Sequence, residues 1–246
     1  MNRDNISYSL TANKLKVIAI LAMFFDHFVA TFVPHEELIG IILRTPGRIA
    51  APIICYFIAE GYFYTSNRRK YIERLLIFAV VSHLPFNLLF GIAFFQATSI
   101  IWGLALGLIA LTAIKSEKVH ILLKPVILGL CCLLAITANW NYVSVLWIVG
   151  FGLFRGSFTK QMIVFSIIGF VFHLIPTYIN FGPGHDGYPH WYQVGIYAAI
   201  PLLAMYNGKL GKKSKIMGWF FYIFYPAHLL FIYVLDRFTT LSEFFR

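Results

Sequence analysis

The stretch KLKVIAILAMFFDHFVATFV, residues 14–33, is apolar apart from the two lysines near its start, Thr31, and the adjacent Asp26 and His27. A helix needs about 20 residues of this kind to cross a lipid bilayer, so the stretch predicts a membrane span. It has no small-residue cleavage site followed by a soluble domain, and we expect it to remain as the first helix. Burying an acid beside a base in such a span is costly, which indicates that the pair has a function.

The whole chain has the same character. Hydrophobic residues make up 59% of its 246 residues and charged residues only 12%, with a mean hydropathy of +0.75. These values exclude an ordinary soluble domain and predict an all-α, polytopic integral membrane helical bundle in one domain, residues 1–246. The apolar runs predict about nine transmembrane helices, at 13–33, 38–65, 71–90, 94–115, 119–137, 141–155, 157–179, 190–206 and 215–238.

The basic residues lie in short clusters between these apolar runs. We therefore interpret the formal net charge of +10 as a sign of topology and of membrane lipids as partners, with no nucleic acid. Basic connections alternate with connections poor in Lys and Arg, which predicts a cytoplasmic N-terminus and a C-terminus outside. The second helix contains Pro46 and Pro52, so we expect it to be kinked or to begin as a separate half-helix.

Several ionisable or polar residues fall inside the predicted spans. A charged group there costs about 2.5–3.5 kcal/mol on insertion scales, so such residues usually face the bundle interior. Helix directions place them in one depth band of the membrane. The members of this predicted polar layer are Asp26, His27, Arg44, Arg48, His83, Asn87, His173 and His228. The layer predicts a reaction or translocation site, and the alternative is a structural ion pair with hydrogen-bonded core histidines.

Within the layer, Arg48 and Asp26 can pair, and a neutral histidine can accept a proton at physiological pH. Neighbouring side chains on a helix do not normally converge, so we expect any histidine partner of Asp26 to come from another helix rather than to be His27.

Glu60 lies one or two helical turns before the basic cluster 68–70, and pairing across that turn is the simplest interpretation. A sharper interpretation assigns the cluster, together with Lys212, Lys213 and Lys215, to the phosphates of a cytoplasmic ligand such as coenzyme A. Anionic lipid headgroups would satisfy the same side chains. None of the three cysteines has metal-ligand spacing, so no metal is expected.

Three segments resemble, in this order, the signature segments of the TraX family. They are KLKVIAILAMFFDHF at 14–28, GRIAAPIICYFIAEGYFYTSNRRKYIERLLIFAVVSHLPFN at 47–87 and YNGKLGKKSKIMGWFFYIFYPAHLL at 206–230. The family's namesake is the membrane acetylase of conjugative F-type pilin. The resemblance implies an acetyltransferase of the bacterial inner membrane that uses cytoplasmic acetyl-CoA as cosubstrate. The acceptor stays open between a peptide or pilin amine and a glycan, through an amino sugar or a sugar hydroxyl.

The resemblance also implies site residues, because the Asp-His pair, the Gly-Arg and Glu-Gly motifs and the C-terminal signature of the family are all matched. It implies catalytic roles for Asp26, His27, Arg48 and His228, with His27 or His228 as the base, and the predicted polar layer adds His83 to the catalytic residues. The residues expected to bind the coenzyme are Glu60, Arg68, Arg69, Arg74, Asn87, Asn207 and Tyr225.

Two other classes of function remain open from the residues alone. One is a small-molecule transporter or lipid-binding protein, in which the polar layer is a passage. The other is a membrane scaffold for pilus or envelope assembly, in which the histidines are core residues. Binding and turnover of acetyl-CoA separate an enzyme from both.

Overall fold

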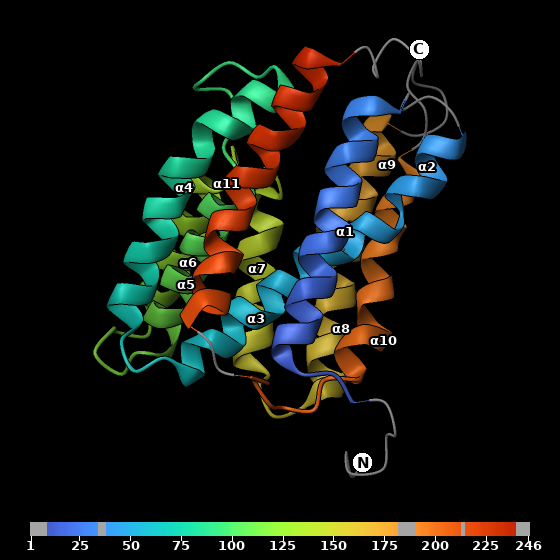
Figure 1. Ribbon diagram of the computed structural model, residues 1–246. Helices are drawn as coiled ribbons and strands as arrows, with labels where there is room; N and C mark the ends of the chain where they lie inside the picture. The colour runs from blue at the N-terminus through green and yellow to red at the C-terminus, as the bar shows by residue number, and fades with distance from the viewer. Residues whose placement is uncertain (1–8, 34–37, 182–189, 213–214, 240–246) are drawn as a thin grey trace.

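The computed structural model describes residues 9–33, 38–181, 190–212 and 215–239. These ranges are helical, and their only β-type pairings are two isolated bridges, Leu10 with Tyr206 and Thr98 with Ala138. The helices form one bundle (Figure 1). In chain order they are α1 (Ala12–Phe32), α2 (Leu38–Arg44), η2 (Pro46–Ile49), α3 (Ala50–Tyr64), α4 (Arg68–Phe90), α5 (Ile100–Lys115), α6 (Leu123–Leu134), α7 (Asn141–Leu153), α8 (Phe158–Gly169), η3 (Phe170–Leu174), α9 (Ile175–Phe181), η4 (Trp191–Ala198), α10 (Ala199–Ala204) and α11 (Lys215–Phe238).

Five helical segments of the described chain are long and apolar enough to cross a membrane. They are Ala12–Phe32, Leu38–Tyr64, Arg68–Phe90, Phe158–Asn180 and Met217–Phe238. Four further apolar helices are 10–17 residues long and so shorter than a full span, namely Ile100–Lys115, Leu123–Leu134, Asn141–Leu153 and Trp191–Ala204. Each predicted span coincides with one of these segments. Five of these segments are long enough to span a membrane, so the predicted number of nine transmembrane helices stays a prediction.

Helices α5 and α6 are shorter than predicted, and a backbone contact joins the residue Thr98 before α5 to the connection between α6 and α7. The N–H of Thr98 donates to the oxygen of Thr137 at 2.8 Å, and the N–H of Asn139 donates to the oxygen of Thr98 at 3.0 Å. This extended pairing takes the place of helical turns, so α5 begins only at Ile100 rather than at 94.

Large apolar side chains are exposed around the outside of the bundle. Val80 of α4 is 75% exposed, Leu133 of α6 is 62% exposed and Phe231 of α11 is 56% exposed. A water-soluble protein avoids apolar surface of this extent, whereas lipid accommodates it. Together with the five long apolar segments, this surface makes the chain a multi-pass membrane protein.

The described basic residues gather mostly at one end of the bundle. At this end the start of α1 contacts the connection after α10, where Asn13 Nδ2 donates to the backbone oxygen of Lys212 at 2.9 Å. We call it the basic end, and it is the lower end in Figure 1, where α1 begins, while α11 finishes at the other end. The segments that meet at this end are the start of α1, the α3–α4, α5–α6 and α7–α8 connections and the segment after α10, and most of the described Lys and Arg residues belong to them. The predicted alternation of charge is present, and the side of the membrane that the basic end faces stays a prediction.

The second apolar segment is broken, as its prolines predict. Helix α2 ends at Arg44, the 3₁₀ turn η2 starts with Pro46, and α3 begins at Ala50. A proline lacks the amide hydrogen of a helical hydrogen bond and is tolerated at the first position of a new turn.

Two glycines allow this break to approach its neighbours. A Cβ on Gly47 would overlap the side chain of Asp26 in α1, and a Cβ on Gly195 of η4 would overlap the backbone oxygen of Thr45. The close approach brings η2 between α1 and η4. It thereby places Arg48 beside α1.

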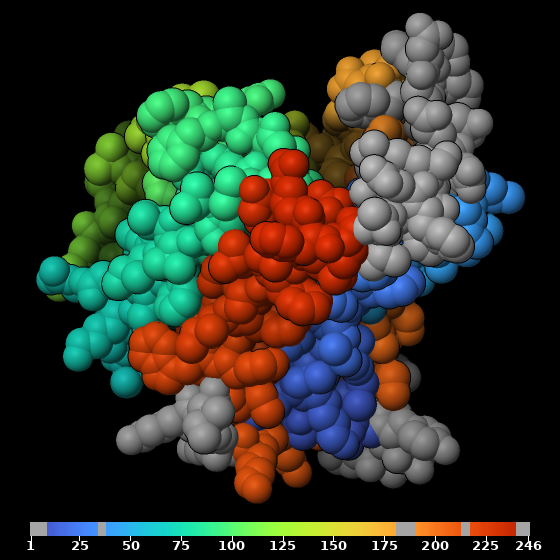
Figure 2. All heavy atoms as spheres, turned by 45° about the horizontal axis from the view of Figure 1, so that its top comes forward, coloured from blue at the N-terminus to red at the C-terminus, as the bar shows by residue number. Residues whose placement is uncertain are grey.

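One face of the bundle is formed by α1, α11 and α4. Figure 2 shows α11 between the other two, and α11 packs against both. This arrangement matters because the residues described next come mainly from these helices and from η2.

Candidate functional site

An ion pair lies in the predicted polar layer. Asp26 accepts a hydrogen bond from Arg44 Nε at 3.3 Å through Oδ1, and one from Arg48 Nη2 through Oδ2. The Asp26 side chain is 4% exposed and those of the two arginines are 15% and 12% exposed. The predicted pairing of Arg48 with Asp26 is confirmed. A histidine partner for Asp26 is not found among the described residues, because the two guanidinium groups occupy both carboxylate oxygens.

Aromatic rings cover the guanidinium groups. The centroid of the Tyr192 ring lies 4.3 Å from Arg44 Cζ and 5.3 Å from Arg48 Cζ, and the Trp140 ring lies 5.6 Å from Arg48 Cζ. Arg48 Nε is buried and has no hydrogen-bond partner among the described residues. Two cations therefore face one carboxylate, and one N–H donor is left for a further oxygen.

The side chains of His27 in α1 and His228 in α11 meet through their nitrogens. His27 Nδ1 lies 2.8 Å from His228 Nε2, and the two ring planes differ by only 6°. His228 Nδ1 lies 2.9 Å from the backbone oxygen of Phe224. A carbonyl can only accept, so His228 Nδ1 carries a proton, and in the neutral ring its Nε2 is the acceptor.

The tautomer of His27 follows from that of His228. If His228 Nε2 accepts, then His27 Nδ1 must donate, and His27 Nε2 is left unprotonated. No described residue donates a hydrogen bond to it. Two successive hydrogen bonds, from His228 to a backbone carbonyl of α11 and from His27 to His228, thus leave a basic nitrogen of His27 without a described donor.

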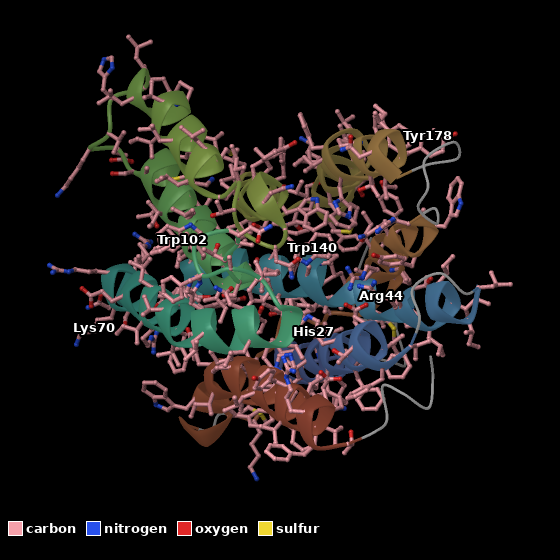
Figure 3. The ribbon with its side chains drawn as sticks, turned by 90° about the horizontal axis from the view of Figure 1, so that it is seen from above. His27, Arg44, Lys70, Trp102, Trp140 and Tyr178 are labelled. Atoms are coloured by element: carbon pink, nitrogen blue, oxygen red, sulfur yellow. The ribbon has the colours of Figure 1, made fainter. Side chains whose placement is uncertain are left out.

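We refer to Asp26, His27, Arg44, Arg48 and His228 as the central group. All of them except His228 line a cavity of about 170 Å³. Figure 3 shows the labelled His27, Arg44 and Trp140 inside the bundle, with Lys70 and Tyr178 at its periphery. A base and an arginine among the residues that line one cavity can act together on a carbonyl compound and a proton donor.

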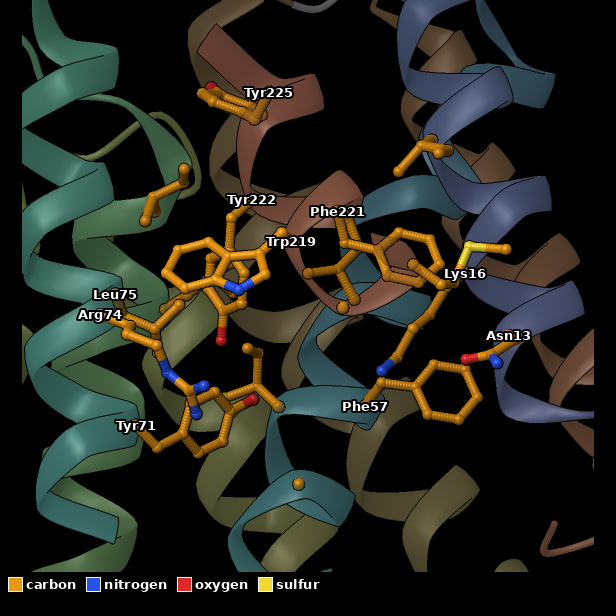
Figure 4. A pocket seen from close by; sticks show the side chains of 18 of the residues that line it. Asn13, Lys16, Phe57, Tyr71, Arg74, Leu75, Trp219, Phe221, Tyr222 and Tyr225 are labelled. Atoms are coloured by element: carbon orange, nitrogen blue, oxygen red, sulfur yellow. The ribbon is translucent and has the colours of Figure 1, made fainter. Parts of the chain in front are cut away.

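A larger cavity of about 510 Å³ lies between this site and the basic end. It is bordered by α1, α3, α4, α5 and α11, and Figure 4 shows residues of its wall. Its charged lining residues are Lys16, Arg74 and Lys212. The two cavities adjoin, because they share the lining residues Met23, Ile54, Ile100 and Tyr225.

His83 and Asn87 form a separate polar group. His83 Nε2 lies 2.7 Å from the backbone oxygen of Phe94 in the connection between α4 and α5, and Asn87 Nδ2 lies 3.2 Å from the same oxygen. The side chains of His83 and Asn87 lie 3.3 Å apart. They share a helix face, as their spacing predicts, but neither lines either cavity.

His173 is also outside the central group. Its Nε2 lies 3.1 Å from Gln193 Oε1, and its ring centroid lies 4.8 Å from that of Trp140. It belongs to η3, a π-helical turn. Its role in this geometry is to support Trp140, which in turn covers Arg48.

Glu60 has a different partner from the expected one. Arg155 Nε donates to Glu60 Oε1 at 2.9 Å, so Glu60 does not pair across the turn with the cluster 68–70. The reason is that Glu60 is a buried residue of α3, which packs against α7, and Arg155 follows the end of α7.

Arg68 and Arg69 at the start of α4 do not line either cavity. Arg69 pairs with Glu73 at 2.8 Å on the exposed surface, and the Arg68 guanidinium lies 4.3 Å from the Tyr62 ring. Arg74 is the member of this predicted set that reaches the larger cavity.

Two residues near the C-terminus that were predicted to bind the coenzyme, Tyr225 and Asn207, lie in different places. Tyr225 lines both cavities. Asn207 stabilises the turn after α10, where its Oδ1 accepts the N–H of Lys209 at 2.9 Å and its Nδ2 lies 3.4 Å from Ser9 Oγ.

Several residues of this region were not singled out from the sequence. Trp140 and Tyr192 cover the ion pair, although they resemble ordinary interfacial aromatics. Lys16 lines the larger cavity, although it was not among the residues expected to bind a ligand, whereas Lys212, which the sharper interpretation included, lines the same cavity. The one available signal was the position of Lys16 inside the first apolar run rather than before it. Within the described ranges, no three His, Cys, Asp or Glu side chains are arranged as a metal site.

Comparisons with known proteins agree with the resemblance of the sequence segments. The model of the family described as TraX protein matches residues 11–236. The chain is also similar to a protein of Dichelobacter nodosus named Probable fimbrial assembly protein FimC, serogroup H1. The two are 27% identical over 234 residues, which cover 92% of this chain and 94% of that protein. No solved structure matches the chain. The family match includes both residues of the histidine pair and all three residues of the ion pair.

Proposed function

The chain belongs to the TraX family, and on this premise we propose that it is an acetyltransferase of the bacterial inner membrane. It takes the acetyl group of acetyl-CoA at the basic end, which faces the cytoplasm, and transfers it to an acceptor at the central group. The relative from D. nodosus is named for fimbrial assembly, which favours the amine of a pilus subunit over a glycan as acceptor.

The observation that carries this proposal is the hydrogen-bonded histidine pair beside a cavity. An amine can attack a thioester only after it has lost its extra proton, and the attack releases a second proton from nitrogen. His27 Nε2 takes this proton as the general base. His228 is the positioning residue, because its hydrogen bond to His27 Nδ1 fixes the tautomer that leaves Nε2 free.

The thioester carbonyl gains negative charge as the amine nitrogen bonds to its carbon. Arg48 supplies the unused Nε–H to this oxygen, and Asp26 holds the guanidinium in place. When the tetrahedral intermediate collapses, the carbon–sulfur bond breaks. The protonated His27 then returns its proton to the leaving thiolate, so the products are an amide and the free thiol of coenzyme A.

The two adjoining cavities support transfer across the membrane. The larger one reaches from the basic end to Tyr225, where the smaller one begins. A donor that entered from the cytoplasm would bring its acetyl group to the central group, and an acceptor would approach from the opposite end. Neither substrate then has to cross the whole bilayer.

The test uses the purified full-length protein in lipid nanodiscs with acetyl-CoA and a pilus-subunit peptide that has a free N-terminal amine. Release of coenzyme A thiol and acetylation of the peptide are both measured. We expect both in the wild type, and a loss of about 10²- to 10⁴-fold in His27→Gln, the usual contribution of a general base.

The matched control is His120→Gln, which replaces an exposed histidine of the α5–α6 connection and should keep full activity. Wild-type rates in folded His27→Gln would contradict the mechanism. Absence of thiol release with peptide, amino-sugar and glycan acceptors alike would contradict the proposal and favour a transporter or an assembly scaffold.

A further inference from the structure

The larger cavity carries positive charge that nothing in its wall balances. Lys16 of α1, Arg74 of α4 and Lys212 of the connection after α10 line it, and its described lining residues include no Asp or Glu. Cations in partly buried positions are normally paired, because their desolvation is otherwise uncompensated. Lys16 is in such a position, whereas Arg74 and Lys212 are exposed at the same cavity. Three cations around one cavity without a carboxylate in its described wall indicate an anionic ligand.

Lys16 is the most informative of the three. It is partly buried, and its Nζ lies 5.4 Å from the centroid of the Phe57 ring and 5.5 Å from that of Phe221. No described carboxylate forms an ion pair with it. Figure 4 shows the Lys16 side chain and Arg74 on opposite walls of the cavity. Lys14, two residues earlier, is exposed and does not line the cavity.

The mouth of the cavity has flat aromatic walls. The Arg74 guanidinium lies 5.8 Å from the ring centroids of both Tyr71 and Tyr222, and the Trp219 and Tyr222 rings are 6.4 Å apart. Such rings suit a planar group such as a nucleobase, because every nucleobase has a flat face that can stack on an aromatic ring. The charge and the aromatic surface lie together near the basic end.

The inner part of the same cavity is apolar. Ile20, Met23, Ile54 and Leu104 belong to this wall, and Tyr225 closes it next to the central group. A narrow, uncharged part of a ligand fits here better than a charged group, because no ionised side chain in this part of the wall could compensate a buried charge.

We propose that the larger cavity is a binding site for a phosphate ester with a long uncharged arm. Lys16, Arg74 and Lys212 hold the phosphates, and the arm runs inward to Tyr225. This inference deepens the proposed function and rests on it only for naming coenzyme A as the ligand. An anionic phospholipid offers the same chemistry. The assignment replaces Arg68 and Arg69, whose side chains lie elsewhere.

The first experiment measures binding by calorimetry to the full-length protein in phosphatidylcholine nanodiscs. The probes are coenzyme A and pantetheine, which has the arm without the phosphates. We expect coenzyme A to bind and pantetheine to bind much more weakly. Lys16→Met should weaken coenzyme A binding about 10- to 100-fold, as expected for one charge-assisted hydrogen bond. Lys14→Met is the matched control on the same helix and should bind as the wild type does.

Lys16→Arg keeps the charge and should retain most of the binding, which separates loss of charge from loss of folding. A second arm uses phosphatidylglycerol nanodiscs and native mass spectrometry. One outcome is that the wild type retains phosphatidylglycerol, Lys16→Met loses it, and neither binds coenzyme A. This outcome would support the site and identify a lipid as its occupant. Binding of both probes unchanged in Lys16→Met and in Lys212→Gln would overturn the proposal.

The outcomes also separate this inference from the proposed function. Acetyl transfer with an unchanged KM for acetyl-CoA in Lys16→Met would overturn the inference and keep the function. Phosphate-dependent and Lys16-dependent binding of coenzyme A without any acetyl transfer would support the inference and contradict the function.

Discussion

The central group and the His83 group both contain a histidine that the sequence predicts in one depth band of the membrane, but only the central group lines a cavity. In the central group, His27 has one nitrogen committed to His228 and one without a described donor. In the His83 group, His83 Nε2 and Asn87 Nδ2 converge on one backbone oxygen of Phe94. The first arrangement leaves a nitrogen free for chemistry, and the second satisfies the α4–α5 connection. Depth in the membrane is therefore a poor guide to catalysis unless the helix face is also known.

The largest effect that sharpens this comparison is expected for Asp26→Asn. The substitution removes the only carboxylate of the central group and leaves Arg44 and Arg48 buried without a counter-charge. Breaking a buried ion pair in this way costs about 3–5 kcal/mol of unfolding free energy. Denaturant unfolding in detergent micelles measures it.

Glu73→Gln is the control for this variant, because it breaks the exposed pair with Arg69 and should cost no more than about 1 kcal/mol. Equal costs in the two variants would mean that the ion pair of the central group does not stabilise the fold.

The next effect is expected at His228 and concerns rate rather than stability. His228→Phe fills the same space but offers no acceptor to His27 Nδ1, so the tautomer of His27 is no longer fixed. We expect acetyl transfer to fall by about 10²-fold, the lower end of what a general base contributes. His228→Gln restores an oxygen acceptor and should lie between His228→Phe and the wild type. Equal rates in both variants would argue against a positioning role.

The smallest effect is expected at His83. His83→Gln keeps a polar side chain near the Phe94 oxygen and touches neither cavity. Acetyl transfer should stay within about twofold of the wild type, and unfolding should become easier by about 1 kcal/mol, the net value of one hydrogen bond. A rate as low as that of His27→Gln would remove the distinction between the two groups and return His83 to the catalytic residues.

Helix positions and the ion pair could be predicted from the sequence because they depend on local patterns. Apolar run length located the helices, and the cost of an unpaired charge within a span favoured the pairing of Arg48 with Asp26. The break before α3 followed from Pro46. The helix positions and the break need no knowledge of which helices are neighbours, whereas the ion pair also requires η2 to pack against α1.

The remaining features depend on long-range packing. Glu60 pairs with Arg155, 95 residues away, and His27 with His228, 201 residues away. Lys16 lies only two residues beyond Lys14 in the sequence, and the packing of α11 against α1 and α4 encloses it in a cavity. Spacing along one chain cannot distinguish these neighbours from others at the same depth.

The shared wall of the two cavities also has an electrical consequence. If donor and acceptor enter from opposite ends, as proposed, the transmembrane potential falls mainly across the level that the two cavities share, that of Met23, Ile54, Ile100 and Tyr225. A charged group that passes this level would do electrical work of about 2.3 kcal/mol per 100 mV. An acetyl group is neutral and does none, while the phosphates of the donor remain on the basic side. Under the proposed function, the cell can therefore acetylate an outer acceptor without drawing on its membrane potential.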